Sequence, residues 1–258
     1  MIMLRMPDTY SCQIVDNEKL NDTAISITLL CADLAADARP GQFLHIKCGD
    51  DLLLRRPLSI CNVFVDILIV VFEVKGRGTH WLSQREPGDR INVLGPLGHG
   101  FVFPDGNIVV VGGGLGTPPM LFAAESANSG VTAVLGFRDM SRVMLVRDFE
   151  DVCDAVYLTT DDGSMGIHGS VVVPLEGLLQ KGGYDAVLAC GQRAMEHEVA
   201  KLCKRYSVPC QVSLEERMGC GVGACLVCTC TTVSKDGSEN MSRVCRDGPV
   251  FDAADVVW

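Results

Sequence analysis

Short apolar runs separated by turn residues fill the first hundred residues of the chain. Runs of this length, rich in β-branched residues, are typical of strands. They lie at Tyr10–Val15, Ala24–Leu30, Gln42–Lys47, Leu58–Val63, Ile67–Val74 and Arg90–Leu94. Turn signals such as Arg39-Pro40-Gly41 and Glu86-Pro87-Gly88-Asp89 separate several of them. This spacing predicts an antiparallel barrel or sandwich, with one short helix inside it at His80–Arg85.

The spacing of the apolar runs changes after Gly95–Gly100, a segment rich in Gly and Pro. Strands then alternate with helices, which predicts a parallel α/β sheet. The expected strands are Ile108–Val111, Thr132–Phe137, Ala155–Thr160 and Ala186–Ala189, and the expected helices are Pro118–Ala127, Val171–Gln180 and Met195–Tyr206. The pattern stops at about Val212, where cysteines become frequent. We therefore predict a β-barrel over residues 1–103, an α/β domain over 104–211 and a small C-terminal module over 212–258.

Composition excludes several classes of function. The formal net charge of −10, without any basic run, makes the chain a poor binder of nucleic acid or of an anionic membrane. No stretch approaches the roughly 20 apolar residues that span a bilayer, and Met1–Tyr10 lacks a signal-peptide pattern. Thirteen cysteines, an odd number in a chain of 258 residues, fit a reducing cytoplasm better than a secreted disulfide scaffold. Outside the features below, we expect buried thiols at Cys12, Cys31, Cys48, Cys61, Cys153, Cys203 and Cys210.

A group of four cysteines carries the clearest chemical signal. Cys220, Cys225 and Cys228 are followed, after sixteen intervening residues, by Cys245. The spacing C-x4-C-x2-C…C is the ligand pattern of a plant-type [2Fe–2S] cluster. Three nearby glycines would let the backbone curl round the cluster and aim N–H groups at its sulfurs: Gly219, Gly221 and Gly223.

The alternative for these cysteines is a structural zinc site. Zinc sites usually take two ligands from each of two C-x2–4-C units, and a division of three plus one fits that arrangement poorly. Cys230 is left over, and we expect it to be a buried thiol.

Two further segments have the composition of phosphate-binding turns. Arg56-Pro57-Leu58-Ser59 opens a predicted strand, and Glu73–Thr79 leads through glycines into the short helix. A glycine-rich turn at a helix start presents free N–H groups to a phosphate. An ordinary barrel strand and turn would show the same residues.

A second glycine loop follows the first strand of the α/β region. The strand ending at Val111 runs into Gly112-Gly113-Gly114-Leu115-Gly116-Thr117 and then a helix, the geometry that places a phosphate on a helix N-terminus. Thr117 stands where a G-x-G-x-x-G motif has its last glycine, and a plain tight turn remains the alternative. Cys190-Gly191 ends a later strand, where open α/β sheets bind ligands. Cys190 could equally be one more buried thiol.

Taken in order, these motifs resemble the ferredoxin–NADP reductase superfamily, whose flavin motif is Arg-x-x-Ser or Arg-x-x-Thr. The resemblance implies that Arg56 holds the FAD pyrophosphate and that Ser59 bonds near flavin N5. It also implies that Val71, Phe72 and Glu73 line the ring or ribose, and that Gly78 and Thr79 bind phosphate. Cys190 would lie beside the nicotinamide, although Gln192 replaces the usual proline.

The choice between NAD and NADP depends on a few charged residues. Asp161 and Asp162 would repel a 2′-phosphate and favour NAD, or they form a solvated turn. Arg138 favours NADP.

Two C-terminal segments are similar to a narrower family within that superfamily. Val212–Gly223, reading VSLEERMGCGVG, and Arg243–Phe251 resemble the electron-transfer subunits of dihydroorotate dehydrogenase B. The resemblance implies a cytoplasmic NAD-linked oxidoreductase subunit of pyrimidine biosynthesis, active in a heterotetramer with two FMN-containing catalytic subunits. Electrons from dihydroorotate would pass through the [2Fe–2S] cluster to FAD and on to NAD⁺. The same build also serves hydrogenases, sulfide dehydrogenases and NADPH–ferredoxin oxidoreductases, so another partner remains an alternative.

Overall fold

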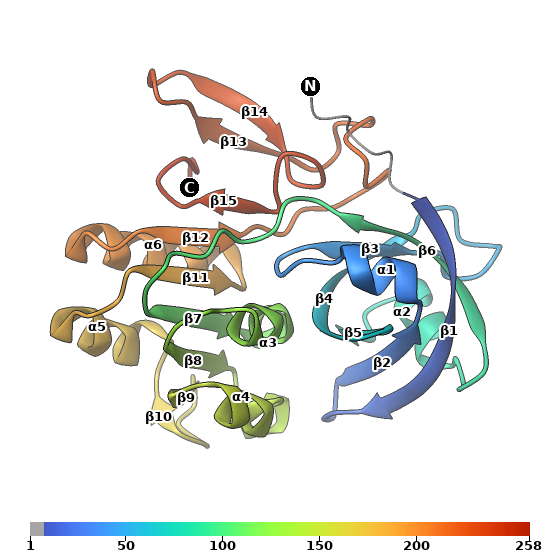
Figure 1. The fold of residues 1–258 in the computed structure, drawn as a ribbon, viewed down its shortest axis with the longest axis horizontal. Helices are drawn as coiled ribbons and strands as arrows, with labels where there is room; N and C mark the ends of the chain where they lie inside the picture. The colour runs from blue at the N-terminus through green and yellow to red at the C-terminus, as the bar shows by residue number, and fades with distance from the viewer. Residues whose placement is uncertain (1–7) are drawn as a thin grey trace.

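Three sheets organise the computed structural model, which describes residues 8–258 (Figure 1). Residues 1–7, where the first predicted domain begins, lie outside the described residues. The sheets are a closed six-stranded barrel, a seven-stranded sheet with helices on both faces, and a two-stranded hairpin near the C-terminus. Within residues 8–258, no helix is long and apolar enough to cross a membrane.

The barrel is antiparallel throughout, as its strand spacing predicts. In barrel order its strands are β1 (Asp8–Lys19), β2 (Ala24–Leu30), β5 (Ile67–Glu73), β4 (Arg56–Phe64), β3 (Phe43–Ile46) and β6 (Arg90–Leu97). Alternate apolar side chains such as Ile27, Leu44 and Phe72 fill its interior. Helix α2 spans Arg77–Ser83, three residues before the expected start. The six-residue helix α1 (Ala32–Asp37) was not predicted, because it is too short to show a helical period.

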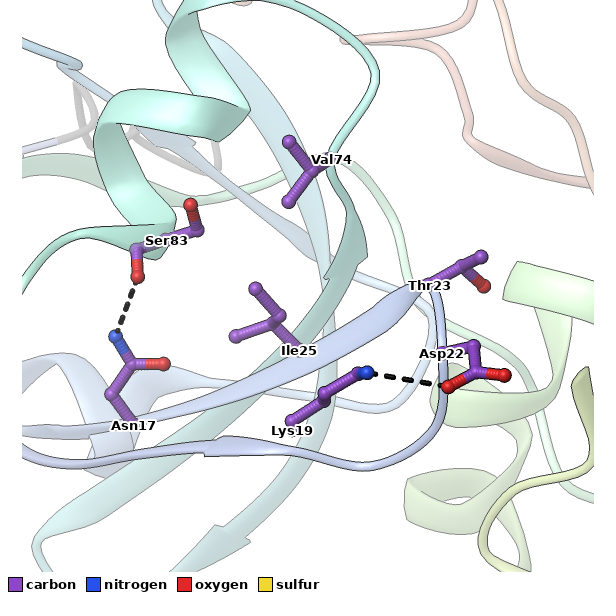
Figure 2. Close-up of a pocket in the computed structure, with 7 residues that line it drawn as sticks. All are labelled: Asn17, Lys19, Asp22, Thr23, Ile25, Val74 and Ser83. Atoms are coloured by element: carbon purple, nitrogen blue, oxygen red, sulfur yellow. Dashed lines mark hydrogen bonds and ion pairs between the residues drawn. The ribbon is translucent and has the colours of Figure 1, made fainter.

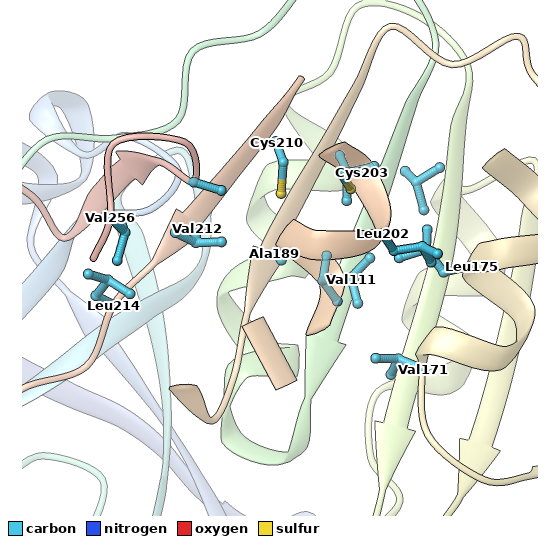
Figure 3. Close-up of a cluster of buried hydrophobic side chains, with 14 of the residues drawn as sticks. Val111, Val171, Leu175, Ala189, Leu202, Cys203, Cys210, Val212, Leu214 and Val256 are labelled. Carbon is cyan, nitrogen blue, oxygen red and sulfur yellow. The ribbon is translucent and has the colours of Figure 1, made fainter. Parts of the chain in front are cut away.

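The larger sheet has the order β10-β9-β8-β7-β11-β12-β15. Its strands are β7 (Ile108–Gly113), β8 (Val131–Phe137), β9 (Ala155–Thr160), β10 (Ile167–His168), β11 (Ala186–Cys190), β12 (Cys210–Ser213) and β15 (Val250–Asp252). Its helices are α3 (Thr117–Glu125), α4 (Val146–Val152), α5 (Val172–Lys181) and α6 (Arg193–Tyr206). Val109 and Val111 pack with residues of α5 and α6, as Figure 3 shows for Val111, Leu175 and Leu202. Ile108 and Val110 pack with α3 and α4 on the other face.

The C-terminal segment differs from its predicted organisation. Strand β12 crosses the expected boundary between residues 211 and 212, and β15 joins the α/β sheet beyond it. The sheet is therefore parallel except at this last strand, which runs antiparallel to β12. Both strands have three or four residues, too few to give a period in the sequence. Helix α4 and strand β10 were also not predicted.

The cysteine-rich module packs directly on the α/β domain. Its hairpin is formed by β13 (Thr229–Val233) and β14 (Glu239–Arg243). Cys228, Cys230 and Cys245 are buried in the same apolar cluster as Leu214 and Val256. Cys230 is thus a buried thiol, as expected. No cysteine of the described residues forms a disulfide, and of the seven other expected thiols only Cys31 and Cys153 are half-buried rather than buried.

Candidate functional site

Three of the four predicted cluster ligands lie on one loop before β13, and Cys245 lies in the turn that follows β14. Backbone N–H groups of the loop donate to their sulfurs. Gly223 N–H lies 3.1 Å from Cys245 Sγ, and Ala224 N–H lies 3.3 Å from Cys220 Sγ. Further N–H donors at 3.4 Å are those of Cys220 to Cys225 Sγ, Val222 to Cys220 Sγ and Cys245 to Cys228 Sγ. Such donors stabilise negative charge on thiolates, which is what an iron–sulfur cluster requires of its surroundings.

The four sulfurs form two pairs. Cys220 interacts through its side chain with Cys225, and Cys245 with Cys228. Burial raises the pKa of Cys220, but the surrounding N–H donors outweigh it and lower the pKa to about 6. Burial and the Cys228 thiol raise the pKa of Cys245 to about 12. Each of the two cysteine pairs can supply two thiolates to one iron, and a [2Fe–2S] cluster needs two protein ligands for each of its two irons.

A second layer fixes the loop behind these sulfurs. The Arg243 guanidinium donates to Asp247 at 2.9 and 3.0 Å, and also to the Gly223 carbonyl at 3.2 Å. Gly221 and Gly223 have φ values of +74° and +81°, a left-handed conformation that favours glycine. The glycines therefore allow the turn, and Arg243, the last residue of β14, ties the loop to the turn that follows that strand.

The structure brings the two halves of the flavin motif together. A Cβ on Gly78 would lie 2.2 Å from Arg56 Nε, so the guanidinium lies flat against the first turn of α2. Arg56 begins β4 and is half-buried. Thr79 uses its hydroxyl to accept the Lys75 N–H at 2.9 Å, so it caps its own helix. Arg56 therefore supplies positive charge at a helix start, as a pyrophosphate site needs.

The residues that end β5 have three different surroundings. Phe72 points into the barrel core and is 2% exposed, so its side chain does not line a cofactor surface as expected. Val71 packs between the barrel and the α/β domain. Glu73 is accessible and pairs with Arg142 at 3.0 Å and Lys75 at 3.1 Å. Alternation along the strand turns Phe72 into the barrel and leaves Val71 and Glu73 on the outer face, where Glu73 is the half-buried polar member.

The nucleotide loop is shaped by close packing. A Cβ on Gly116 would lie 2.1 Å from the Cys190 carbonyl oxygen, and one on Gly112 would lie 2.7 Å from Thr117 Cα. Gly113 and Gly191 both lie against Met195 at the start of α6. The loop and the Cys-Gly turn are thus packed against each other, as the sequence predicts for two parts of one nucleotide site.

Cys190 itself is almost fully buried. Its thiol donates to the Ser213 carbonyl at 3.8 Å, and burial together with Glu196 and Glu215 raises its pKa well above the usual range. Behind it, Glu196 accepts the Gly191 N–H at 3.3 Å. Glu196 is fully buried, and burial raises its pKa to about 9. Sequence reasoning missed Glu196, because a glutamate in an amphipathic helix normally faces water.

One pocket of about 700 Å³ joins the two predicted cofactor regions. Glu73 and Lys75 from the end of the flavin strand line it, as do Gly113, Gly114 and Gly116 from the nucleotide loop. Gly191, Gln192 and Met195 close it from the α6 side. Glu73 is the one predicted FAD residue among its lining residues, which do not include Arg56, Pro57, Leu58, Ser59, Val71, Phe72, Gly78 or Thr79. Gly112, Thr117 and Cys190 of the predicted nucleotide site do not line it either. A ligand bound in the glycine loop would therefore meet the barrel at Glu73.

A smaller pocket of about 400 Å³ lies on the barrel, outside both predicted sites (Figure 2). Asn17, Lys19 and Asp22 line it beside Ser83 of α2. Asn17 Nδ2 donates to the Ser83 carbonyl, and Lys19 pairs with Asp22, both at 3.3 Å. These polar groups satisfy one another, so we assign the cofactor chemistry to the larger pocket.

Comparison with known proteins agrees with this geometry. A family model described as the iron-sulfur cluster binding domain of dihydroorotate dehydrogenase B matches residues 215–257. A Desulforamulus reducens protein named dihydroorotate dehydrogenase B (NAD(+)), electron transfer subunit, is 42% identical over 235 residues, covering 88% of this chain and 89% of that protein. A Geobacillus thermodenitrificans protein of the same name is 41% identical, covering 95% and 96%. The chain belongs to the family of dihydroorotate dehydrogenase B electron transfer subunits.

Solved structures show the same architecture. An NADH-dependent reduced ferredoxin-NADP oxidoreductase, described in connection with flavin-based electron bifurcation, has a TM-score of 0.85 and 29% identity. The match covers 100% of this chain and 92% of that one. A ferredoxin reductase of carbazole 1,9a-dioxygenase has a TM-score of 0.66 at 20% identity, covering 79% and 67%, and it shows the fold alone. The electron transfer subunit thus has the expected reductase-like barrel and α/β domain.

The charged residues that were expected to decide between NAD and NADP lie in the pocket. Arg138, Asp161 and Asp162 all line it. Asp162 accepts the Ser164 N–H, and hydrogen bonds from Ser164 lower its pKa, so it carries a negative charge at neutral pH. Asp161 and Asp162 thus place two carboxylates beside the Arg138 guanidinium, and Lys75 and Arg142 line the same pocket.

His45 is fully buried between the barrel and the cluster loop. Burial and the charge of Arg55 lower its pKa to about 4, although the carbonyls of Cys220 and Arg55 act in the opposite direction. Neither ring nitrogen has a hydrogen-bond partner of normal geometry. A lone histidine in a strand gives no sequence signal for such a position.

Proposed function

We propose that this electron transfer subunit carries electrons from a partner's dihydroorotate-oxidising FMN site to NAD⁺, through its own [2Fe–2S] cluster and FAD. The observation that carries the proposal is the shared pocket, in which Glu73 of the flavin strand faces the nucleotide loop. An NAD whose phosphates are held by the loop would then bring its nicotinamide to a flavin held by the barrel, as hydride transfer requires. The family name and the four paired cysteines support the entry of electrons at the cluster.

The cofactors divide the chemistry. A [2Fe–2S] cluster exchanges single electrons, whereas a flavin accepts one or two and can exchange a hydride with NAD. The chain's own residues bind and orient these groups. Cys220, Cys225, Cys228 and Cys245 would hold the irons, and Arg56 with the first turn of α2 would hold the FAD pyrophosphate. Pro57, Leu58 and Ser59 continue along β4, where Ser59 would bond near flavin N5.

The nucleotide residues have positioning roles. Gly112, Gly113, Gly114, Gly116 and Thr117 would hold the NAD phosphates. Cys190 and Gly191 would fix how far the nicotinamide enters the pocket. Glu196 holds the Gly191 amide in place by accepting its N–H. The carboxylates of Asp161 and Asp162 would repel a 2′-phosphate, which favours NAD over NADP.

The partner subunit would dock on the cluster loop. Three apolar side chains are exposed there: Val222 at 37%, Leu226 at 59% and Val227 at 55%. Cys225 is also exposed, which leaves one side of the cluster site open to a second redox centre. Exposed apolar groups of this kind mark an interaction surface. We propose a heterotetramer with two copies of each subunit, which native mass spectrometry would test.

The decisive experiment uses anaerobically purified holoprotein. We expect a visible spectrum with flavin and iron–sulfur bands, and dihydroorotate-dependent NAD⁺ reduction when a matched FMN subunit is added. The FMN subunit alone is the control, and NADP⁺ in place of NAD⁺ should give much slower reduction. A colourless protein with bound zinc would refute the cofactor assignment, and a lack of coupling with the matched partner would refute the reaction.

A second candidate is the same electron path with another partner. The TM-score of 0.85 and 29% identity with the ferredoxin-NADP oxidoreductase favour this alternative. Reduced ferredoxin replaces the FMN subunit in the same assay. Faster NAD⁺ reduction with ferredoxin than with the FMN subunit would favour this function.

A further inference from the structure

His45 lies in β3, directly opposite the flavin motif. It is paired with Pro57 of β4 on one side and with Leu94 of β6 on the other. Its neighbour Ile46 is paired with Arg56. The guanidinium of Arg55 donates to the His45 carbonyl at 3.2 Å, which fixes the strand at this point. The backbone of His45 is therefore held rigidly beside the residues that are expected to bind FAD.

The same side chain contacts the cluster loop. A Cβ on Gly221 would lie 2.5 Å from His45 Nδ1, so the loop rests on the imidazole ring at the residue after Cys220. Gly221 has a φ of +74°, which turns the loop at this contact. The carbonyls of Cys220 and Arg55 both lie near enough to act on the ring. One side chain thus connects a cluster ligand to the flavin strand.

The ring is not simply filling space. His45 is fully buried, yet neither Nδ1 nor Nε2 has a hydrogen-bond partner of normal geometry. Buried polar groups nearly always have a partner, and an exception calls for a functional explanation. An apolar side chain would occupy this position without the desolvation cost that an unpartnered nitrogen carries. The Cys220 carbonyl acts on the ring in the direction that raises the pKa of His45, so it is a candidate acceptor for an imidazole N–H.

We propose that His45 is a positioning residue for electron transfer, which docks the cluster loop on the flavin barrel by donating an N–H to the Cys220 carbonyl. This inference rests on the proposed electron path. Electron transfer between two centres slows steeply with distance, so a rigid contact between their binding elements sets the rate. A donor on the backbone of a ligating cysteine also stabilises the added negative charge of a reduced cluster, and so raises its potential.

The test compares His45→Leu with His45→Gln in holoprotein, alone and with the FMN subunit. Leucine removes the N–H donor, whereas glutamine retains one. The readouts are FAD content, the electron paramagnetic resonance spectrum of the reduced protein, the cluster midpoint potential and the rate of electron transfer to the flavin. His168→Leu, an exposed histidine of the α/β domain, is the control.

We expect His45→Leu to retain FAD, to change the spectrum, and to lower the cluster potential. A three- to tenfold change in the one-electron equilibrium corresponds to about 30–60 mV. The rate should fall severalfold, and His45→Gln should recover a large part of both losses. Leucine and glutamine variants that behave alike, whether both keep or both lose the cluster, would overturn the proposal. A wild-type protein without cluster or FAD would instead refute the proposed function.

Discussion

Two glycine-rich loops serve different cofactors in this chain, and their shapes have different causes. The nucleotide loop, Gly112–Gly116, joins a buried strand to a helix, and Gly112 and Gly116 are needed there because neighbouring backbone lies so close. The cluster loop, Gly219–Gly223, belongs to no helix or strand, and two of its glycines have left-handed φ values. The first loop is therefore shaped by the packing of its surroundings, and the second by its own backbone and by the sulfurs it surrounds.

This difference has an energetic consequence. Hydrophobic burial of β7 and α3 holds the nucleotide loop in place whether or not a nucleotide is bound. The cluster loop has few apolar contacts of its own, so metal–thiolate bonds should supply much of its stability. Damage to one loop should leave the other intact.

The largest expected effect is that of Cys225→Ser. We expect loss of essentially all of the cluster with FAD retained, because the barrel has its own core. Iron content, electron paramagnetic resonance and the flavin absorbance measure both outcomes. Cys153→Ser, at a half-buried cysteine of the α/β domain, should keep both cofactors. Loss of FAD together with the cluster would show that the two regions are not independent.

Gly223→Ala should remove a substantial part of the cluster. The left-handed backbone costs an alanine about 1–2 kcal/mol, and the Gly223 N–H that donates to Cys245 would be displaced. Gly237→Ala is a matched control, because it has a similar φ of +84° with open space around it. Equal cluster content in the two variants would contradict a specific role for the Gly223 amide.

Gly116→Ala should act on the other loop alone. Its Cβ would collide with the Cys190 carbonyl, so we expect NADH binding to weaken roughly tenfold to a hundredfold, or about 1.4–2.8 kcal/mol. Flavin-quenching titrations with NADH measure this, and the cluster signal should be unchanged. At Gly177 in α5 a Cβ has no neighbour within 4 Å and the φ is not left-handed, so Gly177→Ala should bind NADH more tightly than Gly116→Ala. The opposite order would contradict the packing explanation.

Glu196→Gln should have the smallest effect on cofactor binding, and its effect should be visible as a change in the pH dependence of stability. The pKa of Glu196 is about 9 in the fold against 4.5 without burial, so the folded protein holds a proton that the unfolded chain releases. Its contribution to stability is fully present below about pH 4.5 and is lost as the pH rises toward 9. One such group gives a slope of up to about 1.4 kcal/mol per pH unit.

Thermal unfolding at pH 6 and pH 8.5 measures this slope. Glu196→Gln cannot ionise, so its stability should fall less over this interval than that of the wild type. Glu198→Gln, an exposed position on the same helix, is the control and should follow the wild type. An unchanged slope in Glu196→Gln would show that this carboxyl does not retain its proton on folding.

Sequence patterns predicted the elements with a clear period or motif. The barrel strands and the alternating α/β elements were predicted because their apolar runs are long enough to be read. The four cysteines were predicted from spacing alone. Strands β12 and β15 were not, since they become strands only by pairing with each other and with β11. The expected roles of Val71 and Phe72 also needed the structure, which shows both side chains packed in cores.

The sequence by itself determined which groups could bind iron, flavin and nucleotide, because ligand type and spacing are local properties of the chain. Only the tertiary structure decided which groups meet. It joined Glu73 to the nucleotide loop, buried Glu196 behind Gly191, and placed His45 between Arg55 and Cys220. These contacts link residues far apart in sequence through the packing of one element on another, and no local pattern records that packing.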